Sequence, residues 1–320
     1  MGAIKAQLNA GIIRPSKSEW ASPLHIVHKP SGGIRLTVDY SSLNTVIQFD
    51  PYPMPATKTI FMELTKSRWF SKFDFLKAYH QYPTAKDSIK YTAFVCEFGL
   101  YKYTCMPMGI CTAAAWFQRC IDHALEDFLV RGHLYVYLDD VILHTDTKEQ
   151  HLTEALSLIK TFNDSGLTVS KEKCQIMQKA IGFLGHIVTQ GKVQNDPKKA
   201  EGIKNIPIPK TIHGLQRALG IFNYQREFID HFAELAGPLY NIMALKDAPV
   251  NCRKKNGAVK GKLVNIEWAD QARSCFEKLK EATSGALELY MPDFSQPFDL
   301  TTDASEYGHG AFLSQTTKST

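Results

Sequence analysis

The sequence has few cysteines and no long apolar run, and both shortages narrow the classes of protein to which it can belong. Its 320 residues include 7 cysteines, an odd number, and no pair of them has C-x-x-C spacing. Because no Cys/His cluster has the spacing of zinc ligands, we expect reduced thiols and no zinc site. The chain also lacks an uncharged apolar run of membrane-spanning length and an apolar signal-peptide core near Met1. We therefore expect an intracellular, cytoplasmic protein that is neither secreted nor inserted in a membrane.

Acidic residues are scarce in one part of the chain. Residues 197–262 contain 12 Lys and Arg but only 5 Asp and Glu, whereas the net charge of the whole chain is +5. A concentrated basic stretch suits a polyanionic partner such as nucleic acid. A solvated basic surface without any partner would explain the same composition equally well.

Short apolar runs between turn signals predict a mixture of strands and helices. The expected strands are 24–28, 34–38, 69–74, a hairpin over 135–143 about an Asp-Asp turn, 183–188 and 298–303. The expected helices are 113–129, 151–165, 211–245 and 268–283, and the core-facing stripe of the second is expected at Leu152, Ala155, Leu156, Ile159 and Phe162. Because the strands cluster rather than alternate strictly with helices, the fold class is α+β.

The most specific local feature is Tyr137-Leu138-Asp139-Asp140, two adjacent acids at the tip of an apolar hairpin. Neighbouring carboxylates beside a buried sheet repel each other and are costly to desolvate. The arrangement becomes reasonable if a divalent cation lies between them, and Mg²⁺ prefers a few carboxylates together with substrate phosphates. The alternative is a plain type I′ turn, which also favours Asp.

A third acid, Asp74, ends the expected strand 69–74. If this strand pairs with the hairpin, Asp74 and Asp139 face each other. Two cations can then be held about 3.5–4 Å apart, as two-metal phosphoryl transfer requires.

Ordered blocks along nearly the whole chain resemble the reverse transcriptases of gypsy-type LTR retrotransposons, and more distantly those of retroviruses. The blocks are 11–16, 20–23, 38–40 with 43–44, 70–81, 106–109, 117–119, 137–140, 183–186, 215–224 and 302–305. The resemblance implies an RNA-directed DNA polymerase with a right-hand fold. Its partners would be a primed RNA or DNA template and dNTPs, and its cofactor two Mg²⁺ ions, for which Mn²⁺ can substitute.

The resemblance also implies roles for particular residues. Asp74, Asp139 and Asp140 would be the catalytic, metal-binding carboxylates, with Asp140 in looser contact. Tyr79 would be the steric gate against a ribose 2′-hydroxyl, and Arg35 would hold the triphosphate. The remaining substrate-binding residues would be Met108, Gly109 and Gln118, and the primer grip would be Leu184, Gly185 and His186.

The same resemblance implies the domain order. Fingers and palm would occupy 1–190, a helical thumb 191–246, a basic linker 247–264, and a connection with the start of an RNase H-like domain 265–320. Asp303 would be the vestige of an RNase H site whose other carboxylates lie further downstream in the family. We therefore expect no RNase H activity and interpret the chain as a fragment of a retrotransposon polyprotein. Nothing in the sequence indicates an oligomeric state.

Two other functions share some of these features. An RNA-dependent RNA polymerase has a similar palm and paired aspartates, but usually has a second acid near the steric-gate position, where this chain has Tyr79. A domesticated nucleic-acid-binding protein would keep the basic stretch and lose the carboxylates, which are intact here. Departures from the family pattern at Met108, Thr112, Ala114 and Gln225 concern the nucleotide pocket and the duplex grip rather than the metal ligands.

Overall fold

The computed structural model describes residues 2–28, 32–244, 266–284, 288–292, 296–305 and 308–315. The chain folds into two units: Met1–Glu63 with Ser67–Ile181, and Leu64–Lys66 with Gly182–Thr320. The linker expected over 247–264 lies outside the described residues.

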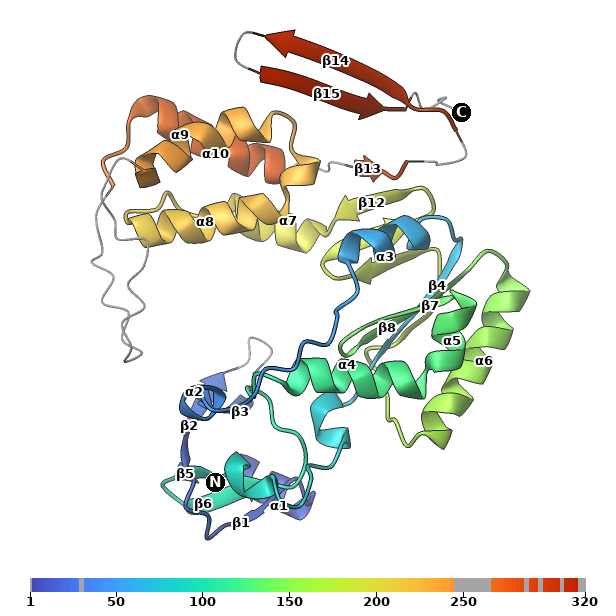
Figure 1. Ribbon diagram of the computed structural model, residues 1–320, viewed down its shortest axis with the longest axis vertical. Helices are drawn as coiled ribbons and strands as arrows, with labels where there is room; N and C mark the ends of the chain where they lie inside the picture. Colours follow the sequence, from blue (N-terminus) through green and yellow to red (C-terminus); the bar gives the residue numbers. More distant parts are fainter. Residues whose placement is uncertain are drawn as a thin grey trace. The chain divides into compact units, whose positions relative to one another are not determined.

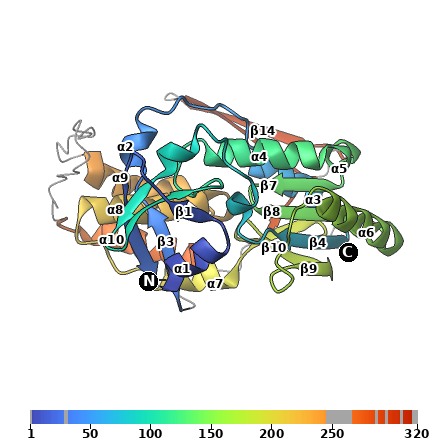
Figure 2. The ribbon, with the colours of Figure 1, turned by 90° about the horizontal axis from the view of Figure 1, so that it is seen from below.

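The first unit contains a four-stranded antiparallel sheet in the order β7-β8-β4-β9 (Figures 1 and 2). Its strands are β4 (Trp69–Asp74), β7 (Leu134–Tyr137), β8 (Asp140–Thr145) and β9 (Gln175–Gln178). Three helices, α4 (Ala113–Ala124), α5 (Glu126–Arg131) and α6 (Lys148–Asp164), share its core. Figure 2 shows α4 running alongside β7, the edge strand.

Strand alternation gives this sheet two chemically different faces. Phe73 of β4 lies opposite Val141 of β8, and both are buried in the core with Phe117 of α4 and Phe162 of α6. Because successive side chains point to opposite faces, Lys72, Asp74 and Asp140 belong to the other face. The helices therefore bury one face of the sheet and leave the carboxylates on the face away from this core.

A second sheet of the first unit has the order β1-β6-β5-β2-β3. Its strands are β1 (Ile13–Pro15), β2 (Ser22–His28), β3 (Ile34–Val38), β5 (Phe94–Cys96) and β6 (Gly99–Tyr103). The strands expected over 24–28 and 34–38 are confirmed as parts of β2 and β3, which pair antiparallel. Five short helices lie between or before these strands along the chain. They are α1 (Gly2–Asn9), α2 (Ser41–Asn44), α3 (Thr57–Leu64), η1 (Ala78–Gln81) and η2 (Ile89–Thr92).

The helix expected over 113–129 is two helices. The chain leaves helical geometry at Leu125, where φ is −116° and ψ is 16°. The apolar residues at helical spacing in this segment, Phe117, Ile121, Leu125 and Phe128, are nevertheless all buried. Continuous apolar spacing predicted the buried face and did not reveal the break.

The face predicted for α6 is partly wrong. Leu152, Leu156 and Ile159 are exposed, whereas the buried residues are His151, Ala155, Leu158 and Phe162. His151 can be buried because Ser71 Oγ lies 2.7 Å from its Nε2 and Thr145 Oγ1 lies 2.9 Å from its Nδ1. Hydrogen bonds at both ring nitrogens offset the cost of burying a polar ring. The end of the helix expected over 151–165 is right to within one residue, and Gly166 follows it with a φ of +69°, as is common just after a helix.

The second unit contains a small sheet in the order β10-β11-β12-β13. The strands are β10 (Ala180–Phe183), which begins at the end of the first unit, β11 (His186–Thr189), β12 (Lys192–Asn195) and β13 (Glu288–Tyr290). The single strand expected over 183–188 is wrong, because Leu184 and Gly185 take positive φ values of 47° and 81° and form a turn. A two-stranded antiparallel sheet, β14 (Asp299–Ser305) with β15 (Gly308–Ser314), contains all but the first residue of the strand expected over 298–303.

Four helices of the second unit share one apolar core. They are α7 (Pro197–Lys204), α8 (Ile212–Tyr224), α9 (Phe232–Ala244) and α10 (Asp270–Ser284). The helix expected over 211–245 is thus divided between α8 and α9 by η3 (Arg226–Phe228). Thr211 begins α8 by accepting a hydrogen bond from the Gly214 N–H, as an N-cap residue does.

The corrected face of α6 gives a stability prediction. Phe162→Ala should lower the free energy of unfolding by about 3–5 kcal/mol, because the ring packs edge-on against Phe73 and Phe75 with centroids 5.5 and 5.4 Å away. Leu156→Ala is the control, because Leu156 lies on the same helix and is 61% exposed. It should change the free energy of unfolding by about 0.5 kcal/mol or less. Denaturant unfolding measures both, and equal losses would contradict the observed face.

Candidate active site

The tip of the β7–β8 hairpin is one residue away from where the sequence suggested. Tyr137 pairs with Asp140, so the two loop residues are Leu138 and Asp139, and Asp140 already belongs to β8. Leu138 has a φ of 55°, while Asp139 is not among the residues with positive φ. A type I′ turn needs positive φ at both positions, so the alternative of a plain type I′ turn fails. A leucine at positive φ persists only where its surroundings hold it there.

Gln118 of α4 holds this turn from the buried side. Its Oε1 accepts a hydrogen bond of 2.8 Å from the Leu138 N–H, and its Nε2 donates one of 3.1 Å to the Val136 carbonyl. The side chain has no exposed surface. In this structure Gln118 fixes the backbone on both sides of Tyr137 and so positions Asp139. The expected contact of Gln118 with substrate stays a prediction.

Asp122 fixes which way the Gln118 amide points. Asp122 Oδ1 accepts a second hydrogen bond of 2.9 Å from Gln118 Nε2, and Asp122 Oδ2 accepts one of 2.7 Å from the Tyr52 hydroxyl. Gln118 Nε2 thus has two acceptors, Asp122 Oδ1 and the Val136 carbonyl. The amide oxygen is therefore the atom that faces the Leu138 N–H. The hydrogen bond to Asp122 raises the pKa of Tyr52 to about 12, so the phenol remains a donor.

The three predicted catalytic carboxylates lie close enough for their charges to affect one another. Asp74 and Asp140 are directly opposite each other across β4 and β8, and the Phe75 N–H donates to the Asp139 carbonyl at 3.4 Å. The cross-strand partner of Asp74 is thus Asp140 rather than Asp139. Burial raises the pKa of Asp139, and the negative charges of Asp140 and Asp74 raise it further. Such a cluster needs positive charge nearby.

Two lysines supply that charge. Lys173 Nζ lies 2.8 Å from Asp74 Oδ1, and Lys72 Nζ lies 2.8 Å from Asp140 Oδ1. The hydrogen bond to Asp74 raises the pKa of Lys173, and the charges of all three carboxylates add to this. Asp139 forms no ion pair with any described residue.

The donors at this site are carboxylate oxygens, which suit Mg²⁺. Within the described ranges, however, no three Asp, Glu, His or Cys residues are arranged as a ready metal site. The reason is visible in the ion pairs, because two of the three carboxylates are directed toward lysines. The residues fit a divalent cation by their chemistry, and accepting one requires a change of ion-pair partner.

Tyr79 lies beside this cluster. It belongs to η1, and its half-buried ring packs 5.0 Å from Phe117. Burial raises the pKa of the Tyr79 phenol, and the nearby charge of Asp139 raises it further. Gln81 fixes the segment by hydrogen bonds to the carbonyls of Leu76 and Thr168, both 2.8 Å long. The structure therefore brings Tyr79 to the carboxylates, as the steric-gate prediction requires.

The other expected nucleotide contacts come from the five-stranded sheet of the first unit and a loop beside it. Arg35 is exposed on β3, and Met108 is also exposed. Gly109 has a φ of +99°, and a Cβ there would lie 3.3 Å from the Val38 carbonyl at the end of β3. Asn44 holds the loop by donating to the Gly109 carbonyl and accepting from the Cys111 N–H, both at 2.9 Å. Glycine is thus needed where the loop meets β3.

The predicted primer grip is the β10–β11 turn of the second unit. The Tyr224 hydroxyl donates to the Leu184 carbonyl at 3.1 Å. The buried His186 ring stacks on Phe228 with centroids 5.3 Å apart and lies 5.7 Å from Tyr224. A Cβ at Gly185 would meet the end of the Lys199 side chain, which is flexible and can move aside, so this turn needs glycine for its positive φ of 81°. Burial lowers the pKa of His186.

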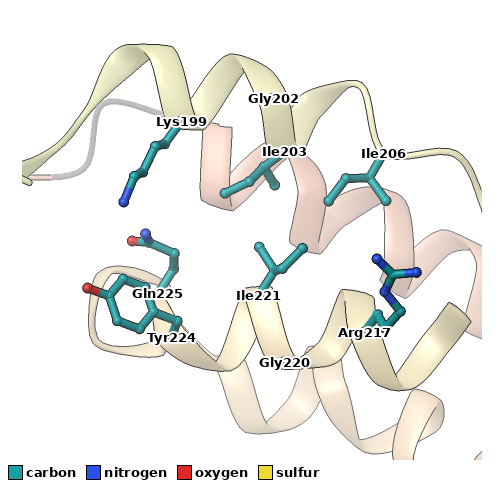
Figure 3. A pocket seen from close by; sticks show the side chains of 9 residues that line it. All are labelled: Lys199, Gly202, Ile203, Ile206, Arg217, Gly220, Ile221, Tyr224 and Gln225. Atoms are coloured by element: carbon teal, nitrogen blue, oxygen red, sulfur yellow. The ribbon is translucent and has the colours of Figure 1, made fainter. Parts of the chain in front are cut away.

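A groove of about 500 Å³ lies between α7 and α8, next to this turn (Figure 3). Lys199 and Tyr224 line one end and Arg217 the other, with the apolar side chains of Ile203 and Ile221 between them. The groove places two cations on one side of the helical part, consistent with the basic composition noted from the sequence. The backbone of Asp303, the predicted vestige of an RNase H site, lies in β14, and its side chain is outside the described part.

Comparison with known proteins decides the family. Residues 27–188 match the reverse transcriptase (RNA-dependent DNA polymerase) family, and residues 268–320 match an RNase H-like domain found in reverse transcriptases. The chain belongs to the reverse transcriptase family. The resemblance stated from the sequence is thus confirmed.

The chain is similar to regions within longer polyproteins. The chain is 33% identical to the retrovirus-related Pol polyprotein from transposon gypsy of Drosophila melanogaster, over 98% of the chain and 30% of that protein. It is 36% identical to the corresponding protein from transposon 297, over 98% of the chain and 28% of that protein. The chain therefore spans under a third of the length of these curated relatives.

Solved structures confirm the right-hand fold. A foamy viral protease-reverse transcriptase in complex with dsDNA is 26% identical with a TM-score of 0.81, covering 95% of this chain and 60% of that one. The same viral protein with an RNA/DNA hybrid is 24% identical with a TM-score of 0.79, covering 98% of this chain and 42% of that one.

The Gln118 contacts give a structural prediction. Gln118→Leu leaves the Leu138 N–H buried without its acceptor, so the free energy of unfolding should fall by about 1–3 kcal/mol. Amide hydrogen exchange at Leu138 should also become faster. Gln150→Leu on α6 is the matched control and should leave Leu138 exchange unchanged. Unaltered exchange in Gln118→Leu would show that Gln118 does not hold the turn.

Proposed function

We propose that this chain is an RNA-directed DNA polymerase that adds dNTPs to a primer 3′ end by two-metal phosphoryl transfer. The observation that carries the proposal is the juxtaposition of Asp74, Asp139 and Asp140 across β4 and β8, beside Tyr79, in a chain of the reverse transcriptase family. The sequence similarity to retrotransposon Pol polyproteins supports a role as part of such a polyprotein.

Asp74 and Asp139 would hold the divalent cations, Mg²⁺ or Mn²⁺, with Asp140 in looser contact. When bound, the metals lower the pKa of the primer hydroxyl and stabilise the leaving pyrophosphate. The protein's own contribution is positioning. Gln118 fixes the turn that carries Asp139, and Lys173 and Lys72 offset the negative charges of Asp74 and Asp140.

The substrate contacts follow from the same proposal. Tyr79 would lie under the incoming sugar and exclude a 2′-hydroxyl. Arg35 would bind the triphosphate, since a planar guanidinium pairs well with phosphate oxygens. Met108 and Gly109 would border the nucleotide, and the turn at Leu184, Gly185 and His186 would hold the primer end.

The proposed partners are a primed RNA or DNA template and dNTPs. Support comes from the basic stretch, from the cations of the α7–α8 groove, and from foamy viral relatives solved with dsDNA and with an RNA/DNA hybrid. The proposal keeps the domain boundaries given from the sequence and a cytoplasmic site of action. No helix in the described part of the chain is long and apolar enough to cross a membrane.

Removing one carboxylate tests the catalytic assignment. Asp139→Asn or Asp74→Asn should lower the rate of primer extension about 10³-fold or more, because each change removes charge that stabilises the transition state. Asp127→Asn, an exposed acid on α5, is the matched control and should extend primers normally. Near-normal extension by either Asp139→Asn or Asp74→Asn would refute the assignment.

The sugar preference tests Tyr79 and separates DNA synthesis from RNA synthesis. Tyr79→Ala should incorporate ribonucleotides while keeping some DNA synthesis, and Tyr79→Phe, which keeps the ring, should still reject them. Primer extension with dNTPs or rNTPs measures the ratio. If Tyr79→Ala discriminates as well as the parent, Tyr79 is not the gate. Efficient use of rNTPs by the parent would instead favour an RNA polymerase.

A further inference from the structure

The carboxylate cluster shares its two lysines unevenly. Lys173 contacts Asp74 and Lys72 contacts Asp140, whereas Asp139 has no ion-pair partner in the described part of the chain. The cluster therefore keeps one carboxylate without a direct ion pair to a described residue, and it is the one at the tip of the turn. The two lysines also differ from each other in burial and in the segments that carry them.

Lys173 is placed to be displaced. Its side chain is 65% exposed, and it follows a short turn in which the Ser170 carbonyl accepts from the Lys173 N–H at 3.0 Å. The Ser170 N–H in turn donates to the Asp74 carbonyl at 2.8 Å. The ammonium can therefore move into water while the backbone stays attached. A divalent cation on Asp74 would compete with this ammonium, because two positive charges at one carboxylate repel each other.

Lys72 is placed to remain. Its side chain is only 19% exposed, and it comes from the middle of β4, which is paired with β8 on one side and with β9 on the other. Lys72 lies diagonally across from Asp140 on the same face of the sheet, a position within reach of a long side chain. Moving this ammonium away would require a rearrangement on a central strand rather than a swing of a surface side chain.

We propose that Lys72 is a positioning residue that keeps Asp140 out of the primary metal contacts, while Lys173 gives way when metal binds Asp74. This inference rests on the polymerase function proposed above. Asp74 and Asp139 would then hold the metal. Asp74 would exchange the Lys173 ammonium for it, and Asp139 has no ion pair with a described residue to break. Lys72 thus makes two adjacent, chemically identical acids unequal.

The test is Mn²⁺ binding to the purified chain without nucleic acid or nucleotide, followed by the electron paramagnetic resonance signal of free Mn²⁺. Lys173→Gln should bind Mn²⁺ roughly three- to tenfold more tightly, because it removes the competing charge at Asp74. Lys72→Gln should also bind more tightly, because it releases Asp140 as an additional ligand. Lys72→Arg keeps the charge and should bind as the parent does.

A double-mutant cycle with Asp140→Asn separates the two lysines. In the Lys72→Gln background, Asp140→Asn should cancel the gain in affinity, because that gain acts through Asp140. In the Lys173→Gln background the gain should persist. Thermal unfolding identifies any variant that does not fold. If Lys72→Gln is one of them, Asp140→Asn alone decides, since it should retain Mn²⁺ affinity within about threefold, a modest change for a charge that metal does not contact directly.

Each outcome has a distinct reading. Parent-like affinity in Lys173→Gln, or a gain in Lys72→Gln that survives Asp140→Asn, overturns the inference. Loss of Mn²⁺ binding in Asp140→Asn does so as well. Asp139→Asn tests the proposed function separately: if that variant binds Mn²⁺ as the parent does, the metal-site assignment itself fails. Asp139-dependent binding that neither lysine affects would refute only the inference.

Discussion

Repulsion among Asp74, Asp139 and Asp140 is the constraint around which the first unit is arranged. Three carboxylates at adjoining ends of two paired strands are unfavourable unless cations lie close by. Lysines meet this requirement in the absence of metal, at 2.8 Å from two of the acids. The opposite face of the sheet is an aromatic core that leaves the strands little freedom to separate and relieve the repulsion. The fold therefore holds the three carboxylates together. Whether they pair with lysines or bind metal depends on which cations are present.

The backbone frame of this site followed closely from local sequence pattern. The bounds of β4 were predicted to the residue, and the paired acids were placed on a hairpin, because the apolar runs there are short and end at acidic residues. The face of α6 was not predictable in the same way. Leu156 and Leu158 are equally apolar, and only the partners available to His151 from neighbouring strands decide which side of the helix is buried. Such partners are invisible in a single helix.

The same limit applies within the site. Lys72 is two residues before Asp74, so strand alternation alone could have placed it beside the acids. Lys173 is 99 residues from Asp74, and no local pattern connects them. Gln118 was recognised within a family block, but its support of the Leu138 turn was not foreseen, because sequence cannot separate a side chain that contacts substrate from one that supports the backbone beneath it. The distinction depends on burial, which only the fold determines.

The β10–β11 turn has a mechanical consequence. Tyr224 of α8 bonds the Leu184 carbonyl, Phe228 of η3 stacks on His186, and Lys199 of α7 covers Gly185. Three helical segments thus grip a turn of only a few residues, while the helices themselves share one apolar core. The turn and the helices should therefore move as one rigid body. Any rotation of the helices would move Leu184 and Gly185 with them.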